Sequence, residues 1–289
     1  MIIVKLMGGL GNQMFQYAFG KALETKFKDT TSFDKSWFDQ KFENVTPRVF
    51  GLDAFNISLH FIDPKRLFFR NPRHSWFKIL KQKIKGKIVC QKITEACFSF
   101  NQIKPNGNFY LEGYWQNNEY YEGIRKIIVE EFHFPKFSCP EDINLQDMIC
   151  GCESVAVHIR RGDYVSSPKT NQYHGTCSMK YYKDAVNKIL SEIPDVKFFL
   201  FTDDPDFVKA NFGFLSDSTL VSNNQRSEID ELNLMHLCKH FIIANSSFSW
   251  WGAWLSQNPN KIVIAPKQWF NNTEANEKCK IVPKDWIRI

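Results

Sequence analysis

Two adjacent arginines end an apolar run in the second half of the chain, within the sequence His-Ile-Arg-Arg-Gly-Asp-Tyr at residues 158–164. Burying two guanidiniums at the end of a strand is costly unless anions compensate their charge. The planar guanidinium fits phosphate oxygens, and a fixed arginine can stabilise the negative charge that develops on a departing diphosphate. The pattern therefore predicts that one arginine binds a phosphate and that the other braces the fold. An ion pair between Arg161 and Asp163 is the purely structural alternative.

Two further polar clusters also follow apolar runs. In the first, the Asp203 carboxylate can accept hydrogen bonds from the N1–H and 2-amino groups of guanine, while Asp204 can cap a helix that starts at Pro205. These carboxylates could instead hold a metal, but nothing nearby completes an oxygen cage. In the second, residues 245–247 (Asn-Ser-Ser) bring hydroxyl and backbone N–H groups to a helix start, which is a ready anion site. Helix capping alone would explain one of these serines.

A glycine-rich turn near the N-terminus, Gly8–Gly11, follows a short apolar strand. The turn lacks the Gly-Lys-Ser/Thr ending of a phosphate-binding P-loop and the spacing of the dinucleotide-binding G-x-G-x-x-G. Its glycines allow the backbone to approach a ligand closely. Asn12 and Gln13 follow directly and are candidates to hold sugar hydroxyls.

Alternating strands and helices must position these clusters. Apolar runs predict strands at Ile2–Leu6, Phe109–Gln116 (leading into a loop), Ser154–Ile159, Lys197–Phe201, His240–Ala244 and Lys261–Ala265. Apolar residues at helical spacing predict helices at 12–23 with Asn12 as cap, Asn117–Phe132, Ser178–Ile193, Pro205–Phe212, Glu228–Leu237 and Phe248–Leu255. This alternation implies parallel sheets, in which ligands bind beyond the carboxyl ends of the strands, where the polar clusters fall. The polar stretch Pro135–Asp147 is the predicted inter-domain linker.

The composition indicates a globular chain with room for two domains. Its 289 residues are 43% hydrophobic and 15% aromatic, with 27 Phe and 8 Trp. Aromatic side chains fill cores, and they also line sugar sites because their faces pack on the C–H faces of pyranose rings. Composition favours the core, and Trp250 and Trp251 are expected there.

The formal net charge is +6, and Lys and Arg are densest at Lys65–Lys92. We expect this stretch to be either a solvated insertion or a patch that touches anionic lipid headgroups. The eight cysteines show no CxxC pair and no zinc-ligand spacing. The N-terminus lacks the features of a signal peptide, and no apolar run reaches 18 residues. The expectation is a cytoplasmic protein with reduced thiols, with a peripheral position at the inner face of the membrane as an option.

The motifs together resemble a known family. GGLGNQMFQYA at the start, GYWQ at 113–116, HIRRGDY at 158–164, FTDD at 201–204 and NSSFSWWGAWL at 245–255 are similar to the α-1,2-fucosyltransferases of bacterial glycan synthesis, in the same order and over nearly the whole chain. The resemblance implies an α/β, GT-B-like fold of two Rossmann-like domains with parallel sheets and a cleft between them. It implies an acceptor-side domain at 1–140 and a GDP-fucose-binding domain at 150–289.

The resemblance also implies the reaction: L-fucose moves from GDP-fucose, with inversion, to the 2-hydroxyl of a terminal β-galactoside, on an acceptor that could be lipid-linked. No metal or other cofactor and no nucleic acid are expected. The implied donor-binding residues are His158, Arg160, Asp203, Ser246, Ser247, Gly9 and Gly11. The implied acceptor-binding residues are Asn12, Gln13, Tyr114, Trp115 and Gln116.

Arg160 and Asp163 are the predicted catalytic residues. Asp163, Glu112 and His174 are candidates for the base that takes the acceptor proton, although an oxocarbenium-like transition state could make a strong base unnecessary. Two alternatives stay open: a related transferase with another linkage or nucleotide sugar, and a non-catalytic module that binds polyanionic glycan or RNA. The second is disfavoured because RNA modules present stacking aromatics on strands, whereas these polar motifs follow strand ends.

Overall fold

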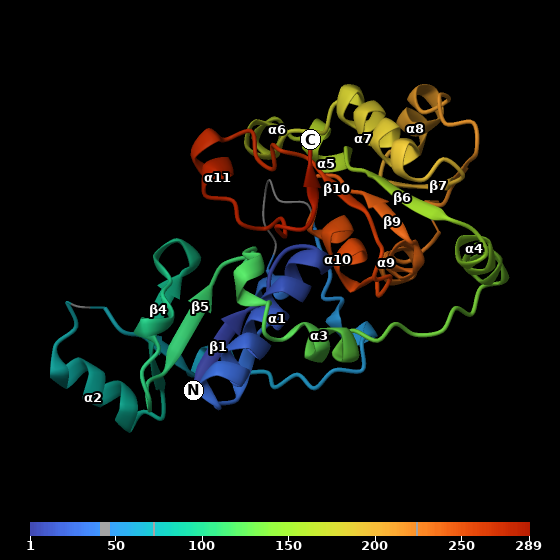
Figure 1. Cartoon of the computed structure of the whole chain (residues 1–289). Coiled ribbons are helices and arrows are strands. Elements are labelled where there is room, and N and C mark those ends of the chain that lie inside the picture. The colour runs from blue at the N-terminus through green and yellow to red at the C-terminus, as the bar shows by residue number, and fades with distance from the viewer. Residues whose placement is uncertain (41–46, 72, 224) are drawn as a thin grey trace. The chain divides into compact units, whose positions relative to one another are not determined.

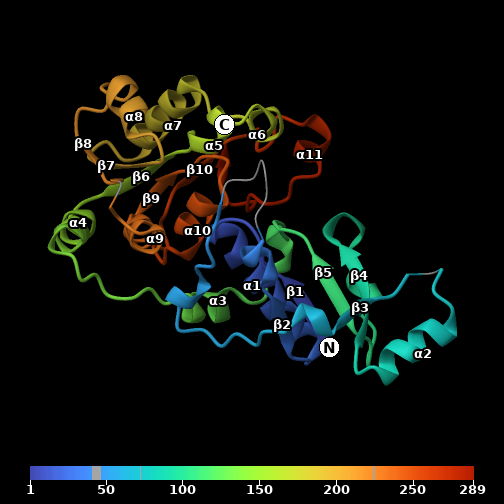
Figure 2. The ribbon, with the colours of Figure 1, turned by 180° about the vertical axis from the view of Figure 1, so that it is seen from behind.

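The computed structural model describes residues 1–40, 47–71, 73–223 and 225–289, without the side chains of residues 163, 166, 168 and 169. The chain divides into two compact units, Met1–His133 and Phe134–Ile289 (Figures 1 and 2). Each unit contains a parallel sheet with helices packed on it, which confirms the predicted α/β class.

Within the described residues, the first unit has a five-stranded parallel sheet in the order β2-β1-β5-β4-β3. Its strands are β1 (Ile2–Lys5), β2 (Thr31–Asp34), β3 (Leu67–Phe69), β4 (Ile88–Thr94) and β5 (Phe109–Glu112). Its α-helices are α1 (Leu10–Phe27), α2 (Trp76–Ile84) and α3 (Arg125–Glu131). Short 3₁₀ turns lie at Ser36–Asp39, Leu52–Ala54, Pro64–Arg66, Glu95–Cys97, Phe100–Gln102 and Asn118–Tyr120.

Helix α1 starts earlier than predicted. Its N-cap is Gly9, whose carbonyl accepts hydrogen bonds from the backbone N–H of Asn12 (3.0 Å) and Gln13 (3.1 Å). The prediction of Asn12 as the cap was therefore wrong, because Asn12 already lies inside the first helical turn. Most of α1 is buried, and its Phe19 stacks on Trp115 with ring centroids 4.1 Å apart. Much of the aromatic content of this unit is therefore core.

The basic stretch Lys65–Lys92 is not a loose insertion. It forms β3, α2 and β4, and the two strands complete the outer edge of the first sheet. Register pairs Leu67 with Ile88 and Phe69 with Cys90. The fully buried Cys90 anchors this edge in a small apolar cluster with Ile3 and Tyr110 of the neighbouring strands.

The described part of the second unit has a six-stranded parallel sheet in the order β11-β10-β9-β6-β7-β8. Its strands are β6 (Ser154–Ile159), β7 (Lys197–Thr202), β8 (Ser218–Leu220), β9 (His240–Ile242), β10 (Val263–Ala265) and β11 (Ile287–Arg288). Its helices are α4 (Pro140–Cys150), α5 (Gly162–Ser166), α6 (Pro168–His174), α7 (Met179–Glu192), α8 (Pro205–Asn211), α9 (Glu228–Leu237), α10 (Ser247–Leu255) and α11 (Thr273–Glu277).

Several predicted elements of this unit are confirmed. Strand β6 has the predicted bounds, and alternate residues Val155, Val157 and Ile159 join a core cluster with α7 and α8. Helix α7 is capped by Ser178, whose hydroxyl accepts from the Tyr181 N–H at 3.1 Å. The predicted buried positions of Trp250 and Trp251 are also confirmed, since both side chains are fully enclosed.

The prediction of Pro135–Asp147 as the inter-domain linker was wrong, because the whole stretch belongs to the second unit. The boundary between the units lies between His133 and Phe134, and α4 packs beside α9. An ion pair fixes α4: the guanidinium of Arg226 contacts Asp142 at 2.6 Å. A polar, Pro-containing sequence suggested a linker, but Pro140 occupies the first turn of this helix, where proline is well tolerated.

In the first sheet β1 and β5 are parallel neighbours, so their carboxyl ends lie at the same edge. In the second sheet the order of strands reverses direction between β6 and β9. Ligands of open parallel sheets bind outside the carboxyl ends of the strands at such a switch point. None of the helices that the structure describes has the length and apolar character needed to cross a membrane.

Candidate functional site

Strands β6 and β7 are joined at their carboxyl ends by two arginine–carboxylate pairs. Arg160 Nη1 lies 2.9 Å from Asp203 Oδ2, and Arg161 Nε lies 3.1 Å from Asp204 Oδ2. The backbone N–H of Arg161 donates to Asp203 Oδ1 at 2.8 Å. Asp203 thus accepts hydrogen bonds from both arginines, because β6 and β7 are neighbours and end at the same level.

The two arginines have different surroundings. The Arg161 guanidinium carbon lies 3.6 Å from the centre of the Phe207 ring and is also held by Asp204, which makes it a brace between β6 and α8. Asp204 caps α8 as predicted, by accepting from the Phe207 N–H at 3.1 Å. Arg160 instead faces Asp203, with the Tyr164 ring 5.4 Å away. Arg161 is therefore the brace that the sequence predicted, and the phosphate contact predicted for Arg160 stays a prediction.

The side chain of Asp163 lies outside the described residues, so its predicted catalytic role stays a prediction. Gly162 shows how tightly this turn is built, since a Cβ added there would lie 2.5 Å from Asp203 Oδ2. The absence of a side chain at this position allows α5 to begin directly against the carboxylate that holds Arg160.

His158 points to the other face of β6 from the α7 core, toward α10, and its ring lies 5.8 Å from that of Phe248. Its side chain is buried, and its Nδ1 has no hydrogen-bond partner among the described residues. Burial, with the charge of Arg160, lowers the pKa of His158 to about 3. The imidazole is therefore neutral near pH 7, and one buried nitrogen is left to meet a ligand group.

The carboxyl end of β9 leads into the start of α10. Ser246 is the N-cap, and its hydroxyl accepts from the Phe248 N–H at 3.3 Å. Ser249 is fully buried, and its hydroxyl bonds back to the Ala244 carbonyl at 3.5 Å. The half-buried Ser247 opens the first turn of α10, where backbone N–H groups and the helix dipole favour an anion.

Asn245 has a structural role beside these serines. Its side-chain amide donates to the carbonyls of His174 (2.9 Å), Gly175 (3.3 Å) and Trp269 (3.1 Å), which fixes the loop after α6 against the end of β9. Tyr164 was given no role from the sequence. Its hydroxyl donates to the Asn245 carbonyl at 3.3 Å, so it ties α5 to the same strand end.

The switch point of the second sheet therefore gathers an arginine, a neutral buried histidine and a helix N-terminus. Arg160 and His158 come from the carboxyl end of β6, and Ser246 and Ser247 from that of β9. A guanidinium beside a helix start is suited to a doubly charged phosphate group.

A second cluster lies beyond the carboxyl ends of the neighbouring strands β1 and β5. Gly8 follows β1 with a φ of +81°, a conformation that favours glycine. Asn12 Oδ1 accepts from Gln116 Nε2 at 2.8 Å, which joins the loops after β1 and β5. Tyr114 lies in the second loop and is 44% exposed. Uncharged hydrogen-bonding groups with an exposed aromatic ring suit a sugar better than an anion.

Two predicted acceptor contacts need correction. Gln13 is fully buried, and its amide is bonded to the backbone of Gly8 (3.0 Å), Val49 (2.9 Å) and Gly51 (2.9 Å). Trp115 is fully buried against Phe19. Both side chains shape the loops and are enclosed, so neither is placed to touch a sugar.

A predicted donor contact also changes. Gly11 was expected to let the backbone approach the donor, but it is buried within α1. Gly9, the half-buried N-cap of that helix, keeps a position from which its backbone can meet a ligand.

The two candidates for the base whose side chains are described, Glu112 and His174, are each held by neighbouring side chains. Glu112 contacts Lys5 at 2.6 Å and also contacts Lys92. Burial opposes ionisation of Glu112, but the hydrogen bonds from the two lysines prevail and lower its pKa, which makes it a weaker base. His174 lies flat against Tyr164, with ring centroids 4.9 Å apart.

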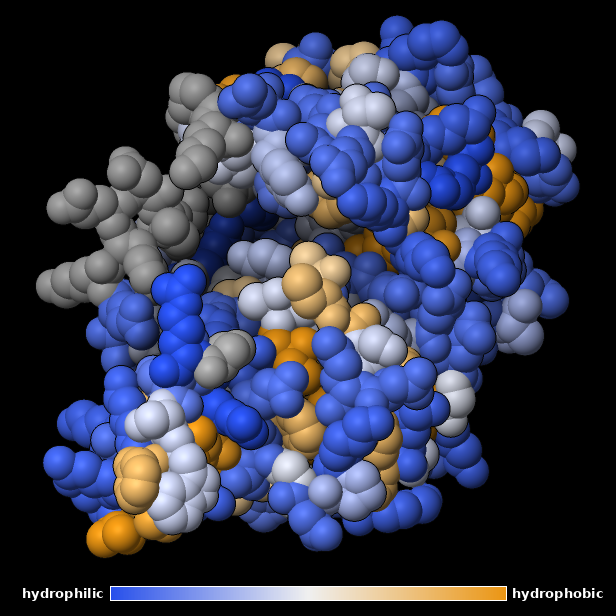
Figure 3. All heavy atoms as spheres, turned by 90° about the vertical axis from the view of Figure 1, so that its left-hand side faces the viewer, coloured by the Kyte–Doolittle hydropathy of each residue, from blue (hydrophilic) through white to orange (hydrophobic). Residues whose placement is uncertain are grey.

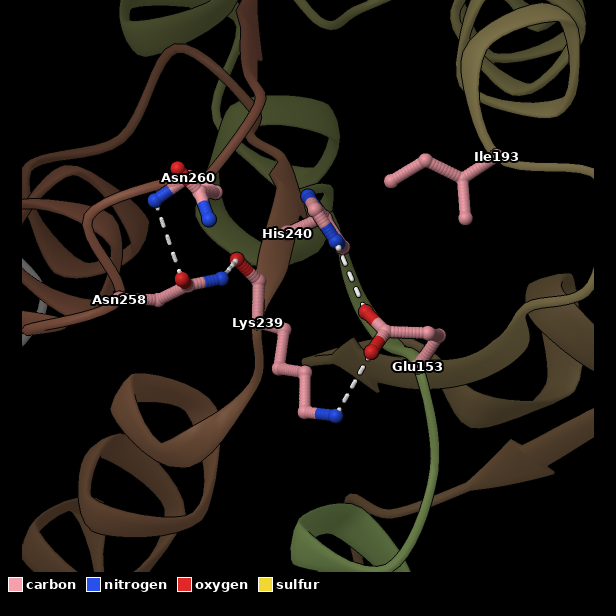
Figure 4. Close-up of a pocket in the computed structure, with 6 residues that line it drawn as sticks. All are labelled: Glu153, Ile193, Lys239, His240, Asn258 and Asn260. Atoms are coloured by element: carbon pink, nitrogen blue, oxygen red, sulfur yellow. Dashed lines mark hydrogen bonds and ion pairs between the residues drawn. The ribbon is translucent and has the colours of Figure 1, made fainter.

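A polar hollow of about 380 Å³ opens at the opposite end of the second sheet (Figure 4). Glu153 contacts Lys239 at 2.8 Å and His240 at 3.2 Å, while Asn258 donates to the Lys239 carbonyl at 3.0 Å. The residues that line this hollow lie near the amino ends of β6 and β9, away from the switch point. Their polar groups bond to one another. This hollow is part of the scaffold.

Among the described residues, no three His, Cys, Asp or Glu side chains are grouped as metal ligands. The prediction of a metal-free reaction stays a prediction, to be tested by assay.

A buried carboxyl behind the site gives a pH prediction. Thr202 N–H donates to the Ser222 hydroxyl at 2.7 Å, and that hydroxyl donates to Glu231. Burial raises the pKa of Glu231 to about 7, although Ser222 and Arg226 oppose the shift. A carboxyl whose pKa is raised by folding takes up a proton on folding, so the free energy of unfolding falls as pH rises from about 4.5 to about 7.

The Glu231→Gln variant is expected to lack this contribution, which amounts to up to about 3 kcal/mol. Urea unfolding at pH 5 and pH 8 checks it: the wild type should lose more stability between the two values than the variant. Equal losses in the two proteins would contradict the assignment.

Two units, each built on a parallel sheet, are the architecture of the GT-B fold class. A structure of the α-1,6-fucosyltransferase NodZ soaked with GDP-fucose aligns over 91% of this chain and 94% of its own, with a TM-score of 0.50 and 17% identity. A structure of POFUT1 in complex with GDP aligns over 91% and 97%, with a TM-score of 0.53 and 13% identity. At these identities the likeness concerns the fold.

The chain belongs to glycosyl transferase family 11, whose model matches residues 1–289. It is 34% identical over 302 aligned positions to an α-1,2-colitosyltransferase of Escherichia coli, covering 100% of this chain and 98% of the relative. It is 30% identical to the O-antigen biosynthesis glycosyltransferase WbnK of Escherichia coli, over 98% and 99%. The resemblance based on the motifs is thereby confirmed at the level of the family, and the protein is a glycosyltransferase.

Proposed function

We propose that the protein is an inverting fucosyltransferase that moves L-fucose from GDP-fucose to the 2-hydroxyl of a terminal β-galactoside during surface-glycan synthesis. The observation that carries this proposal is the cluster of Arg160, His158 and the α10 N-terminus at the switch point of the second sheet. Relatives named as an α-1,2-colitosyltransferase and an O-antigen glycosyltransferase support the 2-linkage and the class of acceptor.

In this function Arg160 binds the diphosphate and stabilises the charge that grows on it as the bond to the sugar breaks. The first turn of α10, with Ser246 and Ser247, binds the same phosphates through backbone and hydroxyl groups. Asp203 accepts hydrogen bonds from the guanine edge, and the neutral His158 meets a donor group through its buried nitrogen. Arg161 keeps the ends of β6 and β7 together while these groups act.

The acceptor contacts are assigned to the first unit. Asn12, Tyr114 and Gln116 lie beyond the carboxyl ends of β1 and β5 and present an amide pair and an exposed ring. Gly9, the proposed donor contact of this unit, lies beside them as the N-cap of α1. The acceptor hydroxyl attacks the anomeric carbon from the face opposite the diphosphate, which inverts that centre. Asp163 remains the proposed base.

A donor panel tests the proposal. The purified full-length chain is incubated with a β-galactoside and, separately, GDP-fucose, GDP-colitose, GDP-mannose or UDP-galactose, and the linkage of each product is determined. GDP-fucose is expected to give the highest kcat/KM and a 2-linked product. If GDP-fucose is inactive while another donor is used, the donor assignment is wrong.

GDP-colitose is the specific second candidate, because one relative is named for that sugar. Colitose is L-fucose without the 3-hydroxyl, so both donors would place the same diphosphate on Arg160. A site that hydrogen-bonds the 3-hydroxyl is expected to reject colitose strongly, since its polar groups would be left unpaired. A preference for GDP-colitose over GDP-fucose would identify that donor instead.

Metal removal is a separate test. Because Arg160 and the start of α10 supply positive charge for the departing diphosphate, full activity is expected in excess EDTA. The rate of transfer is measured with EDTA and then with added Mg²⁺ or Mn²⁺. Loss of activity in EDTA and its recovery with metal would refute the metal-free reaction.

A further inference from the structure

Helix α2 carries large apolar side chains on its outer surface. Trp76, Phe77, Leu80 and Ile84 are 65%, 75%, 38% and 79% exposed, and no residue of this nine-residue helix is buried. Removing these side chains from water would be favourable. Exposed apolar side chains are ordinary when scattered, but four in one short helix form a patch that signals an interaction site.

These four side chains lie on one side of the helix. At 3.6 residues per turn they fall within an arc of about 100°. Ile79 and Gln82 lie outside this arc, and both are half-buried where α2 packs beside β4. The apolar stripe therefore points away from the rest of the first unit. Figure 3 views the side on which α2 lies in Figure 1 and shows apolar side chains protruding among hydrophilic ones at the lower edge.

Lysines border this stripe. Lys81 lies on one side of it and Lys83 on the other, and both are exposed. The surrounding segment 65–92 contains ten Lys and Arg and no Asp or Glu. The net charge of this segment is therefore larger than the net charge of the whole chain, which is +6. The remainder of the chain therefore carries a net charge of −4, and the positive charge is concentrated around α2.

We propose that α2 docks the protein on a membrane surface that contains anionic lipid. A short helix with Trp, Phe and Leu on one face and lysines beside it is suited to lie in the plane of the headgroups, with its apolar side inserted. Each Lys or Arg near such a surface adds to the attraction. A protein partner would also cover the apolar stripe, but the excess of positive charge in segment 65–92 favours the anionic surface. Docking would hold the enzyme beside acceptors attached to lipid.

Vesicle sedimentation of the full chain tests the proposal. The wild type is expected to sediment with vesicles of phosphatidylethanolamine and phosphatidylglycerol, and to remain in solution with phosphatidylcholine vesicles. The Phe77→Ser/Ile84→Ser variant should bind the anionic vesicles at least about tenfold more weakly. The matched control Val49→Ser/Phe214→Ser also removes two exposed apolar side chains and should bind as the wild type does.

A second set of variants tests the charge. The variant Lys78→Gln/Lys81→Gln/Lys83→Gln should weaken binding at least about tenfold. The control Lys126→Gln/Lys180→Gln/Lys278→Gln, at exposed lysines elsewhere, should bind as the wild type does. Transfer to a soluble acceptor should be unchanged in every variant, which shows that each is folded.

Three outcomes would overturn the proposal. The first is wild-type binding no stronger with anionic than with phosphatidylcholine vesicles, and the second is full binding by the α2 variants. The third is a concentration-dependent dimer, detected by light scattering, that is lost in Phe77→Ser/Ile84→Ser while no vesicles are bound. That result would assign the stripe to a second copy of the chain.

Discussion

Replacing Arg160 with alanine is expected to lower kcat by at least about 100-fold. Its guanidinium is the group at the end of β6 that faces the proposed diphosphate, and the neutral His158 cannot substitute for its charge. The fold should survive, because Arg161 continues to join β6 to β7 through Asp203 and Asp204. Transfer rates with saturating donor, together with circular dichroism spectra, check both parts.

Arg160→Lys is the informative companion variant. A lysine keeps the positive charge but loses the planar fork, so its activity should lie between those of the wild type and the alanine variant. Arg161→Ala serves as the control for position: it should mainly lower the unfolding temperature, because that side chain braces α8 through Phe207. Near wild-type turnover in Arg160→Ala would remove the basis of the proposed mechanism.

Replacing Arg226 with alanine is expected to destabilise the second unit by about 3–5 kcal/mol. Its side chain is 1% exposed, and its guanidinium contacts Asp142 and the Val221 carbonyl. Removing the guanidinium leaves the Asp142 carboxylate, itself 8% exposed, without its buried counter-charge. In thermal unfolding the transition of this unit should fall by roughly 10 °C.

The control for this variant is Lys126→Ala, which removes one partner of an exposed pair and should change stability by less than about 0.5 kcal/mol. The double change Arg226→Met/Asp142→Leu should recover most of the lost stability, since apolar groups of similar volume replace a buried pair well. An Arg226→Ala protein as stable as the wild type would show that the pair does not fix α4.

The sequence predicts the central elements of the second unit because the patterns that define them are local. Strand β6 is a continuous apolar run buried on both faces, and α7 combines a serine cap with apolar residues at helical spacing. The edge strands gave no such signal. β8 has three residues and β11 has two, and strands of this length are set by pairing with a neighbour.

The motifs identified the family, but they could not tell which side chain of a motif faces inward. Tyr114 and Trp115 are adjacent, yet one is 44% exposed and the other is fully buried, because Trp115 adopts a φ of +58° that turns its ring into the core. Gln13 likewise has the amide expected of a sugar contact, but three backbone groups occupy it. Glu231 was missed because its burial depends on residues distant in sequence.

The pair formed by Arg160 and Asp203 has a consequence for turnover. A carboxylate 2.9 Å from the guanidinium competes, within the same molecule, with any phosphate for that cation. The Asp203 carboxylate therefore weakens the binding of the GDP diphosphate to Arg160, because the arginine regains an ion-pair partner as soon as the product leaves. Asp203 thus has two opposing effects on GDP: its proposed hydrogen bonds to guanine hold the nucleotide, while its ion pair with Arg160 eases the departure of the diphosphate.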